Sequence, residues 1–207
     1  MSDRRRRKRL RPWLWLSADR FRSVLFVAAV IVPICVLAHA ADLDGVQLPS
    51  TLQADGKTLL LNGIGLRTYS ILGIHIYVAG LYLEQFRTNA DEILQSPETK
   101  LLTIRFKRNV TADQARDAWR KGLVNNCMAP CRIDPQDIAD FIAQVPAMHA
   151  GESYSMLFTA QGATVTVDGI ELATISKPQF AKAMLATFLG RAPASSRLKA
   201  ELLQGHG

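Results

Sequence analysis

The sequence predicts an α+β protein built on a large, mostly antiparallel sheet. Segments in which apolar and polar residues alternate come in runs that are separate from segments with a 3.6-residue apolar period. Two-residue turn signals, Asp55-Gly56 and Asp168-Gly169, join neighbouring strand segments as hairpins. Such separate runs are typical of the α+β class. No repeat, low-complexity tract or linker divides residues 41–207, which therefore form one predicted domain.

The central element of this prediction lies within residues 59–84. Residues 74–84 are apolar at nearly every position, but the run is too short to span a bilayer. It is also too rich in β-branched and aromatic side chains to favour a helix, which predicts a strand buried on both faces. Around it we expect strands at residues 46–50, 57–62 and 100–107 and a short helix at residues 88–95.

Two amphipathic helices follow. Thr111 and Gln114 have capping-box spacing at the start of a helix over residues 111–126. Its predicted inner face comprises Ala112, Ala115, Trp119, Gly122, Leu123 and Asn126. Asp134 as the cap and Pro135 as the first residue begin the second helix. The inner face of that helix comprises Ile138, Phe141, Ile142 and Val145.

Three strands and two helices complete the domain. The strands are expected at residues 153–159, 163–167 and 170–175. Ser176 and Gln179 have capping-box spacing for a helix that ends at Gly190. Its predicted inner face comprises Phe180, Ala183, Met184, Thr187 and Phe188. The last helix is expected over residues 195–203.

Residues 1–40 have the layout of a secretory signal peptide. A basic segment precedes an apolar run, and Ala38-His39-Ala40 is an Ala-x-Ala cleavage signature that places the cut before Ala41. The sequence therefore predicts a periplasmic or secreted protein. The alternative is an uncleaved N-terminal membrane anchor, although the apolar run is shorter than the about 20 residues that a spanning helix needs.

The formal net charge of +7 belongs to this leader. Residues 1–40 contain nine of the 25 Lys and Arg residues and two of the 18 acidic residues, which leaves 16 of each sign in the remainder. A neutral domain gives no indication of nucleic-acid binding. Because no phosphate loop, metal-ligand cluster or hydrolase elbow is present in the sequence, no cofactor or metal is predicted.

Cys127 and Cys131 are the two cysteines that remain once the leader is removed. At helical spacing their Cα atoms are about 6 Å apart, which is within disulfide range. In an oxidising compartment we expect a disulfide that pins the end of the preceding helix. Free thiols are the alternative, and two sulfurs without a nearby histidine do not make a metal site.

Arg67 is the strongest candidate for a functional residue. It lies in an apolar segment, where a guanidinium is costly to desolvate unless an anion meets it. The alternative is that Arg67 pairs with a carboxylate of the protein or reaches water. His75 lies in the apolar strand and is expected to be a satisfied core histidine, not a catalyst.

Two blocks of the sequence resemble the chalcone isomerase family, and in particular its bacterial members. The first block is Asn62-Gly63-x-Gly65-x-Arg67 followed by residues 76–84. The second is residues 180–190, then Pro193 and Leu198-Lys199-x-x-Leu202-Leu203. The resemblance implies the open-faced β-sandwich of that family, a large curved sheet with helices packed on one face and a ligand cleft between them.

The resemblance also implies ligand-binding residues. Arg67 matches the Arg that stabilises an oxyanion in the isomerases and meets a carboxylate in the fatty-acid-binding members; a permanent bidentate donor suits both. Tyr77 falls where the plant enzymes carry a Thr that helps to position a water. Asn126 matches a ligand-contacting Asn, and Thr187, directly before Phe188, matches a Thr that lines the cleft.

Trp119 and Gly122 depart from the plant enzymes, which carry a Tyr and a Lys at the matching positions. Trp and Gly cannot supply the phenol or the ammonium that help the cyclisation, so no efficient chalcone cyclisation is expected. Trp119 shares a helix face with Asn126, which predicts an apolar lining for the cleft. The alternative is that Trp119 belongs to the ordinary core.

The leading hypothesis is an exported, non-enzymatic protein that binds a small amphipathic molecule such as a fatty acid. Arg67 would hold the anionic head, and the cleft would be lined by Tyr77, Trp119, Thr187 and Phe188. The first alternative is an isomerase or lyase that uses Arg67 as an electrophile. The second is a structural or partner-binding module whose cleft is filled by its own side chains. Membrane contact is expected only through an uncleaved leader.

Overall fold

The computed structural model describes residues 40–69, 72–127 and 133–205. They belong to one compact unit, Leu37–Gly207. Residues 1–39 of the predicted leader and Cys131 lie outside the described residues, so the signal peptide and its cleavage stay predictions. Among the helices that the structure describes, none is long and apolar enough to cross a membrane.

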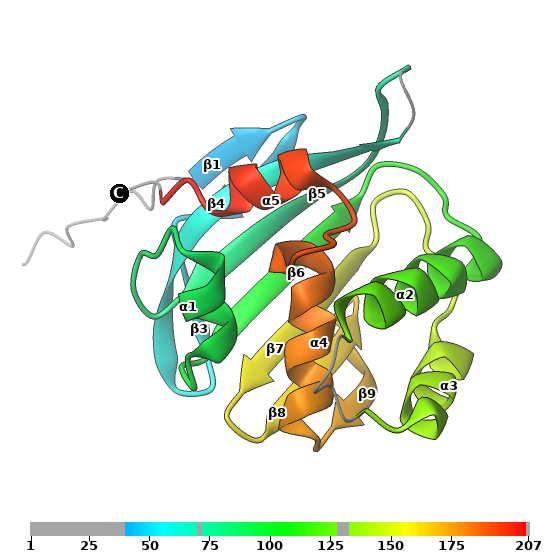
Figure 1. The fold of residues 1–207 in the computed structure, drawn as a ribbon. Coiled ribbons are helices and arrows are strands. Elements are labelled where there is room, and N and C mark those ends of the chain that lie inside the picture. The colour runs from blue at the N-terminus through cyan, green and yellow to red at the C-terminus, as the bar shows by residue number, and fades with distance from the viewer. Residues whose placement is uncertain (1–39, 70–71, 128–132, 206–207) are drawn as a thin grey trace, which may run out of the picture. The chain divides into compact units, whose positions relative to one another are not determined.

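Seven strands form one antiparallel sheet in the order of the sequence, as Figure 1 shows. They are β3 (Thr51–Ala54), β4 (Lys57–Tyr69), β5 (Ile74–Leu83), β6 (Lys100–Phe106), β7 (Ser153–Thr159), β8 (Gly162–Val167) and β9 (Ile170–Ile175). A separate hairpin consists of β1 (Ala40–Leu43) and β2 (Val46–Pro49). The short strands β1 and β3 were not predicted.

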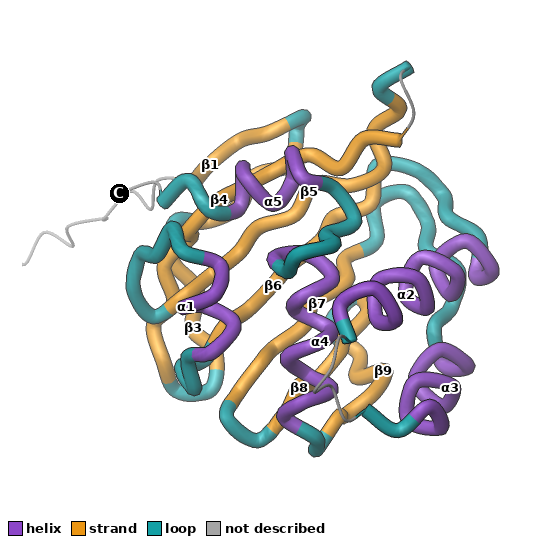
Figure 2. The backbone as a smooth tube through the Cα atoms, in the orientation of Figure 1, coloured by secondary structure: helices purple, strands orange, loops and turns teal. Residues whose placement is uncertain are grey.

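The helices of the domain pack on one face of this curved sheet, as Figure 2 shows. They are α1 (Ala90–Gln95), α2 (Ala112–Asn126), α3 (Pro135–Gln144), α4 (Pro178–Leu189) and α5 (Ser196–Leu202). The main apolar core lies between this helical layer and the sheet. The predicted α+β class, the antiparallel sheet and the single helical layer are thus confirmed.

The local signals at the helix ends were correct at α2 and α3. Thr111 Oγ1 accepts a hydrogen bond from Gln114 N at 3.2 Å, and Thr111 N donates to Gln114 Oε1 at 3.0 Å. The side chain of Asp134 accepts from Gln136 N at the start of α3. The capping box predicted at Ser176 is wrong. Lys177 is the N-cap without a side-chain bond, because the proline that follows already has the backbone angle of a first helical residue.

Helix α4 is buried on nearly all sides and not only on its predicted face. Nine of its 12 residues are buried, because it contacts β8 and β9 of the sheet as well as α1, α2 and α5. Gly190 ends it as predicted, but with a φ of −73° and therefore outside the left-handed region. Glycine is needed there for space, because a Cβ would overlap Asn126 Oδ1 and Ala186 O.

The β1–β2 hairpin covers the opposite face of β4 and β5. Leu48 is part of both apolar clusters on this face, and a Cβ at Gly80 would overlap its Cδ1. Residues Val78 to Leu83 are consequently buried on both faces, as predicted. The prediction of a core histidine at His75 is wrong. The strand leaves the covered region there, and the His75 side chain is 48% exposed, with Nδ1 3.0 Å from Asp44 Oδ2.

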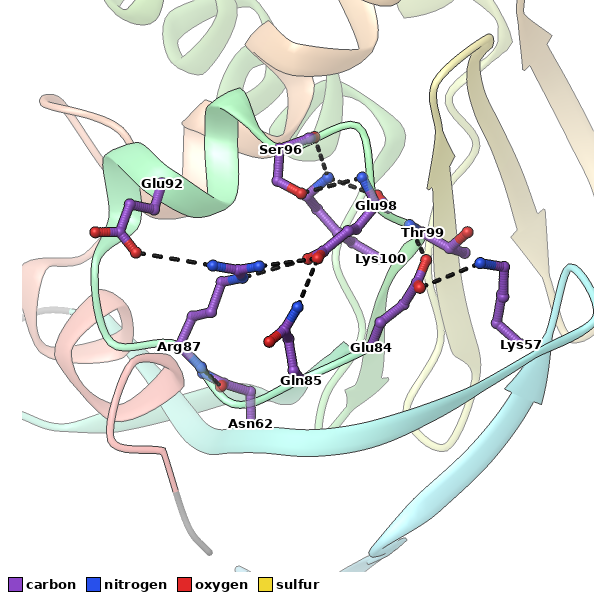
Figure 3. Close-up of polar contacts among 10 residues, drawn as sticks. All are labelled: Lys57, Asn62, Glu84, Gln85, Arg87, Glu92, Ser96, Glu98, Thr99 and Lys100. Atoms are coloured by element: carbon purple, nitrogen blue, oxygen red, sulfur yellow. Dashed lines mark hydrogen bonds and ion pairs between the residues drawn. The ribbon is translucent and has the colours of Figure 1, made fainter.

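A polar network joins the end of β5 to α1 and to the start of β6 (Figure 3). Glu98 accepts from Arg87 Nη2 and from Gln85 Nε2, each at 2.8 Å. The buried Lys100 donates to the backbone carbonyls of Ser96 and Glu98, each at 2.7 Å. Burial lowers the pKa of Lys100, and the hydrogen bond from Arg87 lowers the pKa of Glu98. The network fixes the path of the chain through α1.

We expect Glu98→Gln to destabilise the protein at pH 7 and to lose this effect in acid. A carboxyl whose pKa is lowered by folding stabilises the folded state above its unfolded pKa, about 4.3, and stops doing so as the pH falls through the folded value. Urea unfolding at pH 7 and at pH 3 measures the difference from wild type. Glu92→Gln is the matched control, because Glu92 is 59% exposed and 3.9 Å from Arg87. Equal destabilisation by Glu98→Gln at both pH values would contradict the prediction.

Candidate functional site

Arg67 and Tyr77 lie side by side on β4 and β5. Their Cα atoms are direct partners in the antiparallel register, so both side chains leave the sheet on the same face. That face is the one covered by helices, because Tyr77 packs against the main core cluster. A guanidinium and a phenol that are ten positions apart in the sequence are thus neighbours on adjacent strands.

The guanidinium of Arg67 has no carboxylate partner among the residues that the structure describes. Its one hydrogen bond there runs from Nη1 to the backbone carbonyl of Thr68, at 2.7 Å. Glu201, the carboxylate that α5 brings to β4, is already engaged: it accepts from Leu66 N at 2.9 Å and from Arg197 Nε at 2.7 Å. Most of the donors of Arg67 therefore remain available to an anion.

Tyr77 is a neutral hydrogen-bond donor at physiological pH. Its ring is partly buried and meets Phe106 edge to face, with centroids 5.7 Å apart. Burial raises the pKa of Tyr77 to about 12, against the opposing effect of the positive charge on Arg67. The pair therefore offers one permanent cation and one phenolic O–H from the same face of the sheet.

The glycines before Arg67 position the last helix. Gly63, Gly65 and Arg67 follow one another on the helical face of β4. A Cβ at Gly63 would lie 2.5 Å from the carbonyl oxygens of both Glu201 and Leu202, so only glycine lets α5 pack this closely. Buried Asn62 adds a hydrogen bond to Leu202 O at 2.9 Å. The Asn-Gly-x-Gly segment is therefore the docking place of α5, and Arg67 is the next residue of that row.

Trp119 and Phe188 form an aromatic group between α2, α4 and the sheet. The Trp119 ring lies 6.0 Å from Phe188, 5.1 Å from Phe141 and 6.5 Å from Tyr154, measured between centroids. Trp119 is only partly buried, whereas Phe188 and Tyr154 are buried. The structure thus brings the two predicted apolar site residues into contact with each other.

Asn126 and Thr187 make their polar contacts within the protein. Asn126 Nδ2 donates to Gly122 O at 2.9 Å and to Ala192 O at 2.8 Å, and its Oδ1 accepts from Ala192 N at 3.2 Å. Thr187 Oγ1 donates to Met184 O at 2.7 Å. A Cβ at Gly122 would lie 2.9 Å from Thr187 Cγ2, so glycine at position 122 permits the close contact between α2 and α4. Asn126 and Thr187 therefore stabilise the local backbone of α2, α4 and the loop after α4.

The predicted residues therefore form two groups on one face. No hydrogen bond or ring contact links the Arg67–Tyr77 pair to Trp119 within the described part of the chain, although Tyr77, Trp119 and Phe188 belong to the same apolar cluster. Two surface hollows lie elsewhere. One, of about 480 Å³, is lined by residues of α2 and α3, and the other, of about 410 Å³, includes residues of β2 and β6.

The described residues contain no group of three or more His, Cys, Asp or Glu side chains that could hold a metal ion. Cys127 is the C-cap of α2, with its backbone N–H donating to Leu123 O. Its predicted partner, Cys131, lies outside the described residues, so the Cys127–Cys131 disulfide stays a prediction.

The model of the family described as chalcone isomerase-like matches residues 40–204. The chain belongs to the chalcone isomerase-like family. The structure is similar to the crystal structure of a fatty-acid binding protein from Arabidopsis thaliana, with a TM-score of 0.67 and 13% sequence identity over 80% of this chain and 96% of that one. No curated protein matches the sequence.

Within this chalcone isomerase-like domain, two features of the site escaped the sequence analysis. Glu201 bonds to Leu66 across 135 residues of sequence, and Asn62 bonds to Leu202 across 140. No local sequence pattern predicts such contacts between α5 and β4. Tyr154 was placed on a strand, but the alternation of that strand does not say that its ring would meet Trp119. Both contacts depend on the packing of helices on the sheet, which only the fold defines.

Proposed function

We propose that this chalcone isomerase-like protein binds a small amphipathic acid, such as a fatty acid, with Arg67 at the anionic head. The observation that carries the proposal is the guanidinium of Arg67, which lies on the helix-covered face and has no carboxylate partner among the described residues. A guanidinium in this position, without a carboxylate of the protein beside it, is stabilised by the anionic group of a bound ligand. The unpaired state disfavours the alternative in which a salt bridge closes the site.

Tyr77 suits the same head group. A carboxylate accepts several hydrogen bonds, and the guanidinium and the neutral phenol of Tyr77 supply donors from one side. The apolar body of the ligand would lie along Trp119 and Phe188. Asn126 bonds the end of α2 to Ala192, which follows α4, and Thr187 packs against Gly122 of α2. The structural neighbour from Arabidopsis thaliana is by its title a fatty-acid binding protein, which supports this class of ligand.

A comparison of paired ligands tests the proposal. Calorimetric titration with a long-chain fatty acid and with the alcohol of the same length should show that the acid binds at least about tenfold more tightly, because only the carboxylate gains a charge-assisted bond. Native mass spectrometry of the purified protein would identify what copurifies. Equal affinity for acid and alcohol, or no binding of either, would refute the proposal.

We also propose that the protein is exported and that Cys127 and Cys131 then form a disulfide. The Ala-x-Ala signature before Ala41 supports export, and an oxidising compartment favours the pairing of two cysteines four residues apart. N-terminal sequencing of the exported protein should begin at Ala41, and thiol counting under denaturing conditions should find no free thiol. An intact basic leader on soluble protein, or two free thiols in the oxidised protein, would count against these proposals.

A further inference from the structure

The hydroxyl of Tyr154 is a buried polar group whose hydrogen-bonding capacity is not satisfied by the described residues. Tyr154 is 3% exposed, and within the described part of the chain its hydroxyl oxygen has no hydrogen-bond partner of acceptable geometry. The indole of Trp119 lies near enough to oppose, in part, the rise that burial causes in the pKa of Tyr154. An indole N–H can only donate, so the proton of the hydroxyl still lacks an acceptor. Leaving such a group unsatisfied is costly.

Tyr154 lies on the same face of the sheet as Tyr77 and in the same apolar cluster as Trp119 and Phe188. On the helical face Tyr154 pairs with Ile104, which pairs with Ala79, two residues along β5 from Tyr77. The Tyr154 and Tyr77 backbones are therefore about 10 Å apart across the strands and about 7 Å along them. The Tyr154 ring also contacts Trp119, which in turn contacts Phe188. A ligand with its head at Arg67 and its body along Trp119 would meet the two tyrosines with different parts.

We infer that Tyr154 is a second polar contact of the ligand site and that it selects an acid carrying an acceptor oxygen, a carbonyl or a hydroxyl, on its apolar body. The inference rests on the proposed function and narrows its ligand class. A ligand oxygen would accept the proton that the fold leaves unpaired, which favours an oxygenated acyl chain over a plain hydrocarbon chain. Arg67 would select ligands with a negatively charged head group. Tyr154 would select ligands that carry an acceptor oxygen at a defined distance from that head group.

Thr103 provides a matched control within the same sheet. Its Oγ1 is the other buried side-chain oxygen without a partner among the described residues. It lies 3.3 Å from the Cβ position of Gly80, on the face covered by the β1–β2 hairpin and Leu48. Thr103→Val therefore removes an equally unpartnered hydroxyl on the side of the sheet away from the proposed ligand.

The experiment measures affinities for hexadecanoic acid and for keto-hexadecanoic acids with the carbonyl at successive positions. Wild type should prefer one keto position over the parent acid by about fivefold or more. Tyr154→Phe should abolish this preference while leaving the affinity for the parent acid within about twofold. Thr103→Val should retain both. In thermal unfolding without ligand, Tyr154→Phe should melt at the wild-type temperature or above, since it removes an unsatisfied group.

The outcomes separate this inference from the proposed function. If the parent acid binds but no keto position is preferred, or if the preference survives Tyr154→Phe, Tyr154 is not a ligand contact and only the inference fails. A lower melting temperature for Tyr154→Phe would show that the hydroxyl has a partner inside the protein, which also overturns it. If no acid binds to wild type, the proposed function fails and the inference with it.

Discussion

Replacing Arg67 by alanine should weaken the binding of a fatty acid at least tenfold and leave the binding of the matching alcohol unchanged. The substitution removes a charge-assisted hydrogen bond, worth about 2 kcal/mol or more when the group is shielded from water. Arg67→Lys should restore only part of the loss, because an ammonium is a point charge and cannot make the bidentate contact. Calorimetry or fluorescence displacement gives both affinities.

Trp119→Ala is the companion variant in this experiment. It removes apolar lining and not charge, so it should weaken acid and alcohol by the same factor. Circular dichroism on each variant excludes unfolding as the cause. If Arg67→Ala binds acid and alcohol as wild type does, Arg67 is structural and the binding site lies elsewhere.

A methyl group at Gly63 should cost about 3 kcal/mol of folding stability, which corresponds to a melting temperature roughly 6–12 °C lower. The Cβ would lie 2.5 Å from two backbone carbonyl oxygens of α5, and backbone cannot rotate away as a flexible side chain can. Helix α5 would have to lift from β4 and so expose Leu198 and Leu202, both buried against it. Thermal unfolding followed by circular dichroism measures the shift.

Gly73→Ala is the control for Gly63→Ala. Gly73 has a φ of +65° and open space where its Cβ would be, so alanine there meets only the backbone cost of about 1–2 kcal/mol. The difference between the two variants isolates the steric contact with α5. A Gly63→Ala protein that melts no lower than Gly73→Ala would mean that α5 accommodates the methyl group, contrary to the packing described above.

The sequence predicted those parts of the fold that depend on local patterns. The capping box at Thr111 and the cap at Asp134 are short-range hydrogen bonds, and each was placed at the correct residue. The signal at Ser176 had the same spacing but failed, because the proline two residues later imposes its own start on α4. His75 failed because alternation cannot show where the covering hairpin ends.

The sequence predicted which residues belong to the candidate site, but not how their side chains are used there. The resemblance selected Arg67 and Tyr77, and the register of β4 and β5 places them side by side. It also selected Asn126 and Thr187, whose polar side-chain atoms are hydrogen-bonded to backbone groups of the protein. A motif specifies that a position matters, but it does not distinguish a side chain that meets a ligand from one that bonds to the neighbouring backbone. That difference depends on tertiary contacts.

The docking of α5 on β4 affects the order in which the contacts of the fold can form during synthesis. Asn62 and Leu66 on the strand reach their partners only when residues 201 and 202 have emerged, 135 to 140 positions later in the chain. Closing so long a loop slows folding, and until then the glycine row beside Arg67 remains uncovered. In a chain that is synthesised from its N-terminus, this row is therefore covered by helix only after residues 201 and 202 have been made.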